Sequence, residues 1–246
     1  MCRFISSKFI NELDSYYARE DLRGALAYLT QCREDCVRDG DLPSLLTVLN
    51  EFTGLYRQTK QEAEGMQCIA DCEELLEKVK PGAKTEGTIL LNCATTMKSY
   101  GKADEAMRLY EKAEDLLTAV LHENDPLLAG FYNNMALALQ DTGNAEKAEE
   151  YFLRALGITG KSREQALEYA ITCVNLAHLR FEKDYLDESV NTLLDSAMDI
   201  LSNDEFYSFD KYAFTCRKCA PSYGYFGRFA DEKYLNERAD RKYAGN

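Results

Sequence analysis

Small side chains recur along this chain at intervals of about forty-one residues. Four residues after each comes a large apolar side chain, and three further on comes a second small one. This spacing keeps all three on one face of a helix. We call each set of equivalent positions in successive units a column. The first column consists of Ala25, Gly65, Ala106, Ala148 and Ser189, which are separated by 40, 41, 42 and 41 residues. The second is Leu29, Ile69, Tyr110, Phe152 and Leu193, and the third is Cys32, Cys72, Ala113, Ala155 and Ser196. A fixed period of this length predicts stacked units, none of which can bury its apolar face alone.

Each period divides into two predicted helices joined by a short turn. In the fourth unit the pattern predicts a first helix over 128–140, a break over 141–144 and a second helix over 145–158. Gly143 suits the left-handed conformation that often follows a helix, and Gly101 occupies the same place in the third unit. Asp125 and Pro126 are predicted to cap and open the first helix of the fourth unit.

The remaining units follow the pattern with departures. Their turns are predicted at Glu20, Lys60 and Asp184, where no glycine is present. The sixth unit fits two registers, one built on Ala230 followed by Tyr234 and the other on Gly227, which follows four regularly spaced residues. Those four are Cys216, Cys219, Ala220 and Tyr223. Pro221 is expected to kink or break the first helix of this unit.

The columns resemble the tetratricopeptide repeat, in which the same small and large positions mark the second helix. The segments 133–136 (Asn-Asn-Met-Ala) and 174–177 (Val-Asn-Leu-Ala) match its first helix. The unit here is longer than the usual 34 residues or so. Together with the phrase His122-Glu-Asn-Asp-Pro126, this length resembles the repeats of kinesin light chains. The resemblance implies a right-handed superhelix whose concave groove is lined by the first helices, and it implies peptide or protein binding.

The predicted fold is therefore all-α, a superhelical solenoid of about six helix-turn-helix repeats. We expect a single domain over 1–246, because four prolines and fourteen glycines leave little room for long linkers. The approximate repeats are 5–41, 42–82, 83–125, 126–165, 166–205 and 206–246.

Charge and composition restrict the classes of binding partner and the cellular location that we expect for this protein. The net charge of −13 argues against a nucleic-acid binder, which needs a basic face. The charge is uneven: residues 1–204 carry 21 basic and 36 acidic side chains, and residues 205–246 carry 8 and 6. A solvated acidic surface is the ordinary explanation of this balance. The alternative is that the C-terminal end attracts an acidic partner. No apolar run is long enough for a signal sequence or a membrane span, and nine cysteines indicate a reducing compartment. We expect a cytoplasmic protein without a membrane partner.

The cysteines are the strongest candidates for chemistry, and packing explains most of them. A zinc site requires four ligands, whereas the chain has one C-x-x-C pair, Cys216 and Cys219, and only two histidines, His122 and His178. Several cysteines instead occupy packing columns of the helices. No nucleophile elbow or phosphate-binding loop is present. We therefore expect no enzyme activity, no cofactor and no metal, with reduced and mostly buried thiols.

Polar side chains in the first helices are the candidate binding residues. Asparagine recurs in three successive first helices, and an asparagine offers both a donor and an acceptor to an extended peptide. The alternative is that these asparagines bond neighbouring helices to one another. The predicted groove residues are Asn92, Asn134, Asn175, Asn133, Arg57, Lys98, Gln140 and His178. Apolar contacts are expected from Tyr17, Phe181 and Tyr225.

The sequence thus favours a non-enzymatic scaffold that binds a peptide or protein segment in its groove. Arg57 and Lys98 would favour a segment with acidic residues. The alternative function is a regulatory sensor whose superhelix closes around a small signalling peptide. A third possibility, an enzyme built on the cysteine pairs, lacks the other ligands that it would need. The oligomeric state stays open.

Overall fold

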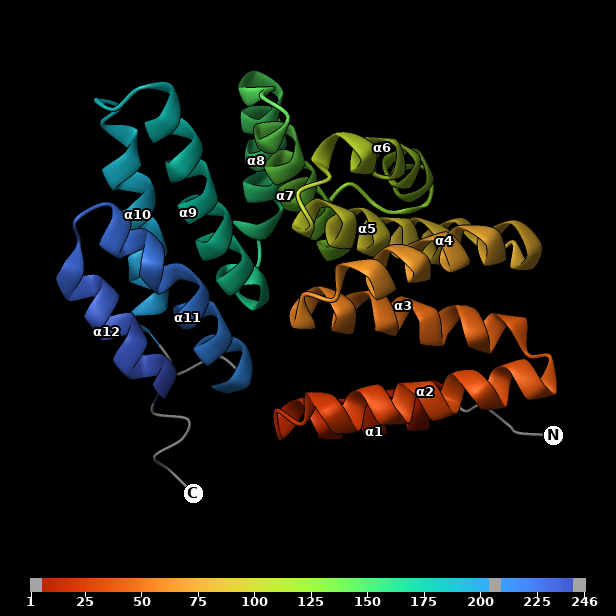
Figure 1. Ribbon diagram of the computed structural model, residues 1–246. Coiled ribbons are helices and arrows are strands. Elements are labelled where there is room, and N and C mark those ends of the chain that lie inside the picture. The colour runs from red at the N-terminus through yellow and green to blue at the C-terminus, as the bar shows by residue number, and fades with distance from the viewer. Residues whose placement is uncertain (1–5, 204–208, 241–246) are drawn as a thin grey trace. The chain divides into compact units, whose positions relative to one another are not determined.

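The computed structural model describes residues 6–203 and 209–240, and over these residues it consists of twelve α-helices with no strand (Figure 1). The helices of the first three repeats are α1 (Ser6–Ala18), α2 (Leu22–Asp39), α3 (Leu42–Thr59), α4 (Glu62–Val79), α5 (Ala83–Ser99) and α6 (Ala103–Val120). Those of the last three are α7 (Pro126–Asp141), α8 (Ala145–Thr159), α9 (Ala166–Lys183), α10 (Ser189–Leu201), α11 (Phe209–Tyr225) and α12 (Phe229–Asp240). The prediction of an all-α fold made of six helix-turn-helix repeats is confirmed.

The chain divides into two compact units between Leu121 and His122. In unit 1, α3 packs against α4 and also against α5, the first helix of the next repeat, and α5 packs against α6. In unit 2, α9 packs against α10 and α11 in the same way. Neighbouring first helices therefore pack against each other in both units, as α3 does against α5 and α9 does against α11. The organisation of 1–246 as one continuous domain with the repeat boundaries given above remains a prediction.

Four of the five predicted turns contain a residue with a positive φ. Glu20 and Lys60 both adopt φ of 56°, and Gly101 and Gly143 adopt 77° and 79°. The fifth differs, because Asp184 has extended backbone with φ of −150° and α10 begins only at Ser189. At α7 the side chain of Asp125 accepts a hydrogen bond from the Leu127 N–H at 2.9 Å, so the predicted cap is confirmed.

The small-residue column lies in the core of the first four repeats, where Ala25, Gly65, Ala106 and Ala148 are buried. In the fifth repeat the prediction is wrong by one residue. The buried residues of α10 are Val190, Leu194, Ala197 and Leu201, not the predicted Ser189, Leu193 and Ser196. The longer turn before α10 rotates the helix by this one position, which turns the apolar stripe toward α9.

In the sixth repeat, Gly227 is the turn residue, with φ of 74°, and Ala230 is exposed. Pro221 does not break the first helix of this repeat, since α11 continues through it to Tyr225. Residues on both sides of the proline are buried, and the Tyr223 hydroxyl donates to the Leu194 carbonyl oxygen at 2.8 Å. These contacts hold the last turn of α11 against α10 despite the missing backbone hydrogen bond.

Candidate functional site: the faces of the first helices

An asparagine pair joins the two neighbouring first helices of unit 1. Asn92 on α5 donates its side-chain N–H to Oδ1 of Asn50 on α3 at 2.9 Å, across 42 residues of sequence. Asn50 in turn donates to Glu51 at 3.1 Å. Both asparagines are half-buried. We call the helix stripe that carries Asn50 and Arg57 on α3, and Asn92 on α5, the first-helix face of unit 1.

Unit 2 repeats this arrangement on α7 and α9. Asn175 donates to Oδ1 of Asn133 at 2.9 Å, again across 42 residues, and Gln140 donates to Glu182 at 2.7 Å. The partner of Asn175 is thus Asn133. Asn134, one residue on, is rotated by about 100° around α7 and is half-buried. The stripe through Asn133 and Gln140 on α7 and Asn175 and Glu182 on α9 is part of the first-helix face of unit 2.

These asparagines bond neighbouring helices and also remain partly exposed. Oδ1 of Asn92 and Oδ1 of Asn175 accept no hydrogen bond from any residue in 6–203 or 209–240. Each pair therefore fixes the orientation of its amides while leaving an acceptor available. A side chain already held in one rotamer loses little further entropy when it binds a ligand.

Arg57 lines a pocket of about 620 Å³ on the first-helix face of unit 1. We call it the Arg57 pocket, and its lining residues are Tyr17, Glu20, Leu22, Glu51, Gly54, Arg57 and Gln58. Within the described chain, the Arg57 guanidinium makes no ion pair, and burial lowers its pKa. Burial also raises the pKa of the Glu51 carboxyl and raises the pKa of Tyr17 to about 12. The pocket thus combines one cation that has no ion pair in the described chain with two glutamates and a neutral phenol.

Lys98 lies off the stripe of the asparagine pair in unit 1, whereas His178 lies about one turn from Asn175 on α9. Lys98 follows Asn92 by six residues, which rotates it by about 240° on α5, and it is half-buried. His178 packs its ring against Tyr225 and Phe226 of α11, with centroids 5.0 and 4.7 Å apart. Burial lowers the pKa of its imidazole, and the nearby Glu182 only partly opposes this shift.

The cysteines are packing residues. Of the eight that the structure describes, none forms a disulfide bond and seven are buried; the ninth, Cys2, lies outside the described residues. Cys72 is buried and lies close enough to Cys68 and to Cys93 of the next first helix for both thiols to affect its pKa, as the packing column predicts. Burial raises the pKa of Cys219 to about 12, so this thiol is not activated. Over the described ranges, no three histidine, cysteine, aspartate or glutamate side chains converge as metal ligands would.

Asn50 and Glu182 are members of these faces that the sequence did not single out. Subtracting the 42-residue repeat from Asn92 leads to Asn50, and adding it to Gln140 leads to Glu182. The signal was therefore present in the spacing. The spacing was ambiguous at the asparagines, because Asn133 and Asn134 are adjacent. A period of 42 residues matches Asn133 with Asn175, whereas a period of 41 matches Asn134 with it.

The fold and these faces define a helical-repeat protein with polar side chains on its first helices. Residues 129–162 match the profile of the tetratricopeptide repeat family. A search of curated proteins gives no match.

The structure of BtubC (BKLC) from P. vanneervenii is similar, with a TM-score of 0.65 and 18% identity over 91% of each chain. The tetratricopeptide-like repeats of a putative kinesin light chain from Podosopora anserina have a TM-score of 0.59 at 18% identity, over 81% of this chain and 95% of that one. The structure of NprR in complex with its cognate peptide NprX has a TM-score of 0.66 at 10% identity, over 98% and 68%.

At these identities the solved structures establish the fold. They confirm the prediction of tetratricopeptide-like repeats similar to those of kinesin light chains. Among the helices of the described ranges, none has both the length and the apolar character needed to cross a membrane.

Proposed function

We propose that this protein is a non-enzymatic scaffold that binds a peptide or an extended protein segment on its first-helix faces. The Arg57 pocket is the main support, because it is large enough for several side chains and contains a half-buried guanidinium without an ion-pair partner in the described chain. A buried cation is usually paired, so an accessible unpaired one suits a ligand carboxylate. The thiols fit a reducing compartment, and we propose a cytoplasmic location.

The asparagine pairs would hold the backbone of the ligand. An asparagine side chain offers the same groups as a peptide bond, so it binds an extended backbone without reading its sequence. Arg57 would add selectivity for a carboxylate. Glu20 and Glu51 line the same pocket, so a second acidic side chain would be repelled there. We therefore expect a ligand with one acidic residue at this point, not an acidic run.

A peptide sensor is the second candidate. The similarity to NprR, whose solved complex contains its cognate peptide, supports it. A sensor changes its dimensions on binding, whereas a scaffold does not need to. Small-angle scattering of the protein with and without a bound peptide separates the two, since a smaller radius of gyration in the complex would favour the sensor.

The experiment selects binders from a displayed library of random linear peptides and measures their affinity by fluorescence polarisation. Arg57→Met keeps the apolar stem and removes the charge. Losing a charge-assisted hydrogen bond costs about 1.5–3 kcal/mol, so affinity should fall roughly tenfold to a hundredfold. Asn92→Ala should weaken binding by about 1–3 kcal/mol.

Lys78→Met is the matched control. It removes the same charge from an exposed residue of α4 that pairs with Glu74, away from the pocket, and should leave affinity unchanged. Equal binding by Arg57→Met and the parent protein, with normal helix content, would contradict the proposed site. Failure of the library to yield any binder would contradict the function itself.

A further inference from the structure

Five aromatic side chains meet at the surface of unit 2, where α9 and α11 end. We call them the aromatic cluster: His178, Phe181, Tyr185, Tyr225 and Phe226. Phe181 lies at their centre, with its ring centroid 5.0 Å from that of Tyr185 and 5.3 Å from that of Phe226. Phe181 and Phe226 are partly buried against the core of unit 2, whereas Tyr185 is 74% exposed and Tyr225 is 60% exposed. Exposed clustered aromatics are typical of recognition sites.

The electrostatic surroundings of the aromatic cluster are negative. Glu182 and Asp184 are exposed beside it. The two cations of the same helix end, Arg180 and Lys183, are both bonded to Glu149, each at 2.9 Å. In addition, α9 and α11 both end here, and the carbonyl end of a helix carries partial negative charge. Aromatic faces, carboxylates and two helix C-termini all favour the same ligand group, a cation.

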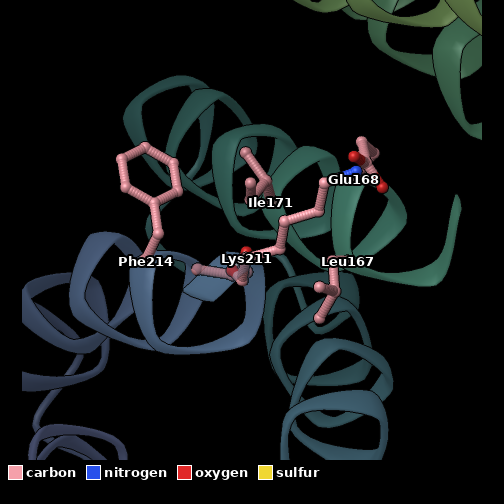
Figure 2. A pocket seen from close by; sticks show the side chains of 6 residues that line it. Leu167, Glu168, Ile171, Lys211 and Phe214 are labelled. Carbon is pink, nitrogen blue, oxygen red and sulfur yellow. Dashed lines mark hydrogen bonds between the residues drawn. The ribbon is translucent and has the colours of Figure 1, made fainter. Parts of the chain in front are cut away.

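A second site lies on the same two helices, nearer to their N-termini. This pocket of about 390 Å³ is called the Phe214 pocket, and its lining residues are Leu167, Glu168, Ile171, Lys211, Phe214 and Thr215. Figure 2 shows Phe214 and Ile171 projecting from α11 and α9, with the Lys211 side chain extending toward Glu168. Phe214 is 65% exposed, so the apolar lining is available to a ligand side chain.

The two sites share one stripe of each helix. Ile171 and His178 are separated by about two turns of α9, and Phe214 and Tyr225 by about three turns of α11. Eleven residues of helix between Phe214 and Tyr225 correspond to about 16 Å. An extended peptide covers this distance in about five residues. Lys218 lies between them on α11, so the negative end of the face is confined to the aromatic cluster.

We propose that this face of unit 2 binds a partner segment that carries an arginine or lysine on the aromatic cluster and a large apolar side chain in the Phe214 pocket, about five residues apart. The basic side chain stacks on Tyr225 and Phe181 and pairs with Glu182. This proposal rests on the peptide-binding function proposed above. The Arg57 pocket concerns the part of the ligand that binds unit 1, and the present proposal adds the side chains that unit 2 would bind.

The test uses the full chain and the same displayed library of random linear peptides, with individual binders then measured by fluorescence polarisation. Enriched peptides should contain a basic residue about five positions from a large apolar one. Tyr225→Ser and Phe214→Ser should each reduce their affinity about tenfold. Glu182→Gln should reduce it about fivefold, with the loss diminishing at high salt. Replacing the basic residue of the peptide by glutamate should abolish binding.

Phe229→Ser is the matched control, because Phe229 is 69% exposed but belongs to neither site, and it should bind as the parent does. Enriched peptides that are insensitive to Arg57→Met and lack a basic residue, or that bind Tyr225→Ser and Phe214→Ser normally, would overturn the proposal. If binders respond to Arg57→Met but not to Tyr225→Ser, the proposal for unit 2 fails while the scaffold function stands. If the library yields no binder, both fail.

Discussion

Gly87 of α5 is a position where a single added methyl group should destabilise unit 1. A Cβ built on Gly87 would lie 2.7 Å from Cγ and 2.9 Å from Cδ2 of Leu117 on α6. Leu117 is fully buried, so it cannot rotate into solvent to make room. Overpacking of this kind costs about 1–3 kcal/mol. Alanine regains up to about 1 kcal/mol through its higher helix propensity. We expect Gly87→Ala to lower the free energy of unfolding by about 1–2 kcal/mol.

Urea unfolding followed by far-UV circular dichroism measures this change. Gly130→Ala is the control, because a Cβ on this glycine of α7 meets nothing within 4 Å, and it should raise stability by about 0.5–1 kcal/mol. The sign should also reverse in a Leu117→Ala background, where the added methyl group enters the vacated space. If Gly87→Ala is as stable as the parent protein, or destabilises equally without the Leu117 side chain, the packing argument is refuted.

Three further changes test turns, hydrogen bonds and titration. Lys60→Gly should raise the free energy of unfolding by about 1 kcal/mol, because Lys60 has φ of 56°, whereas Lys60→Ala should change little; equal stability of the two variants would contradict this. Tyr100→Phe removes the hydrogen bond from its hydroxyl to the Gln61 carbonyl oxygen at 3.1 Å and should cost about 0.5–1.5 kcal/mol in the same assay. Burial lowers the pKa of His178 below 6.5 in the folded protein. As the pH is lowered, this histidine is therefore protonated at a higher pH in the unfolded chain than in the folded one. The free energy of unfolding should fall as the pH drops below about 6.5. His178→Gln should remove that part of the loss, which urea titrations at about pH 7 and about pH 5 would reveal.

The fold followed from the sequence because the repeat imposes it several times over. Ala106 and Ala148 mark equivalent positions, so an error in one unit is corrected by the next. In the fifth repeat the buried positions of α10 were predicted one residue too early. The backbone is extended at Asp184, and the apolar stripe of α10 begins at Val190. Spacing alone predicts a periodic stripe but not how many residues a turn contains.

The site was less accessible to sequence reasoning, and the reason is geometric. Arg57 and Lys98 are predicted together as groove residues, but the asparagine pair joins α3 and α5 at a spacing of 42 residues, which aligns Arg57 with Ser99. An error of one residue rotates a side chain by about 100°. The aromatic cluster was only partly anticipated, through His178, Phe181 and Tyr225, because Tyr185 and Phe226 follow the ends of α9 and α11, where the repeat pattern is weakest.

The buried thiols make this chain its own reporter of local opening. A buried cysteine reacts with an alkylating reagent only when its surroundings open, so its rate of labelling measures the frequency of that opening. Five of the six repeats contain such a thiol within the described chain, and the fourth repeat does not. The residues are Cys36, Cys68, Cys72, Cys93, Cys173, Cys216 and Cys219. Mass spectrometry of peptides after timed labelling would therefore show which repeats a bound partner holds closed, without any engineered probe.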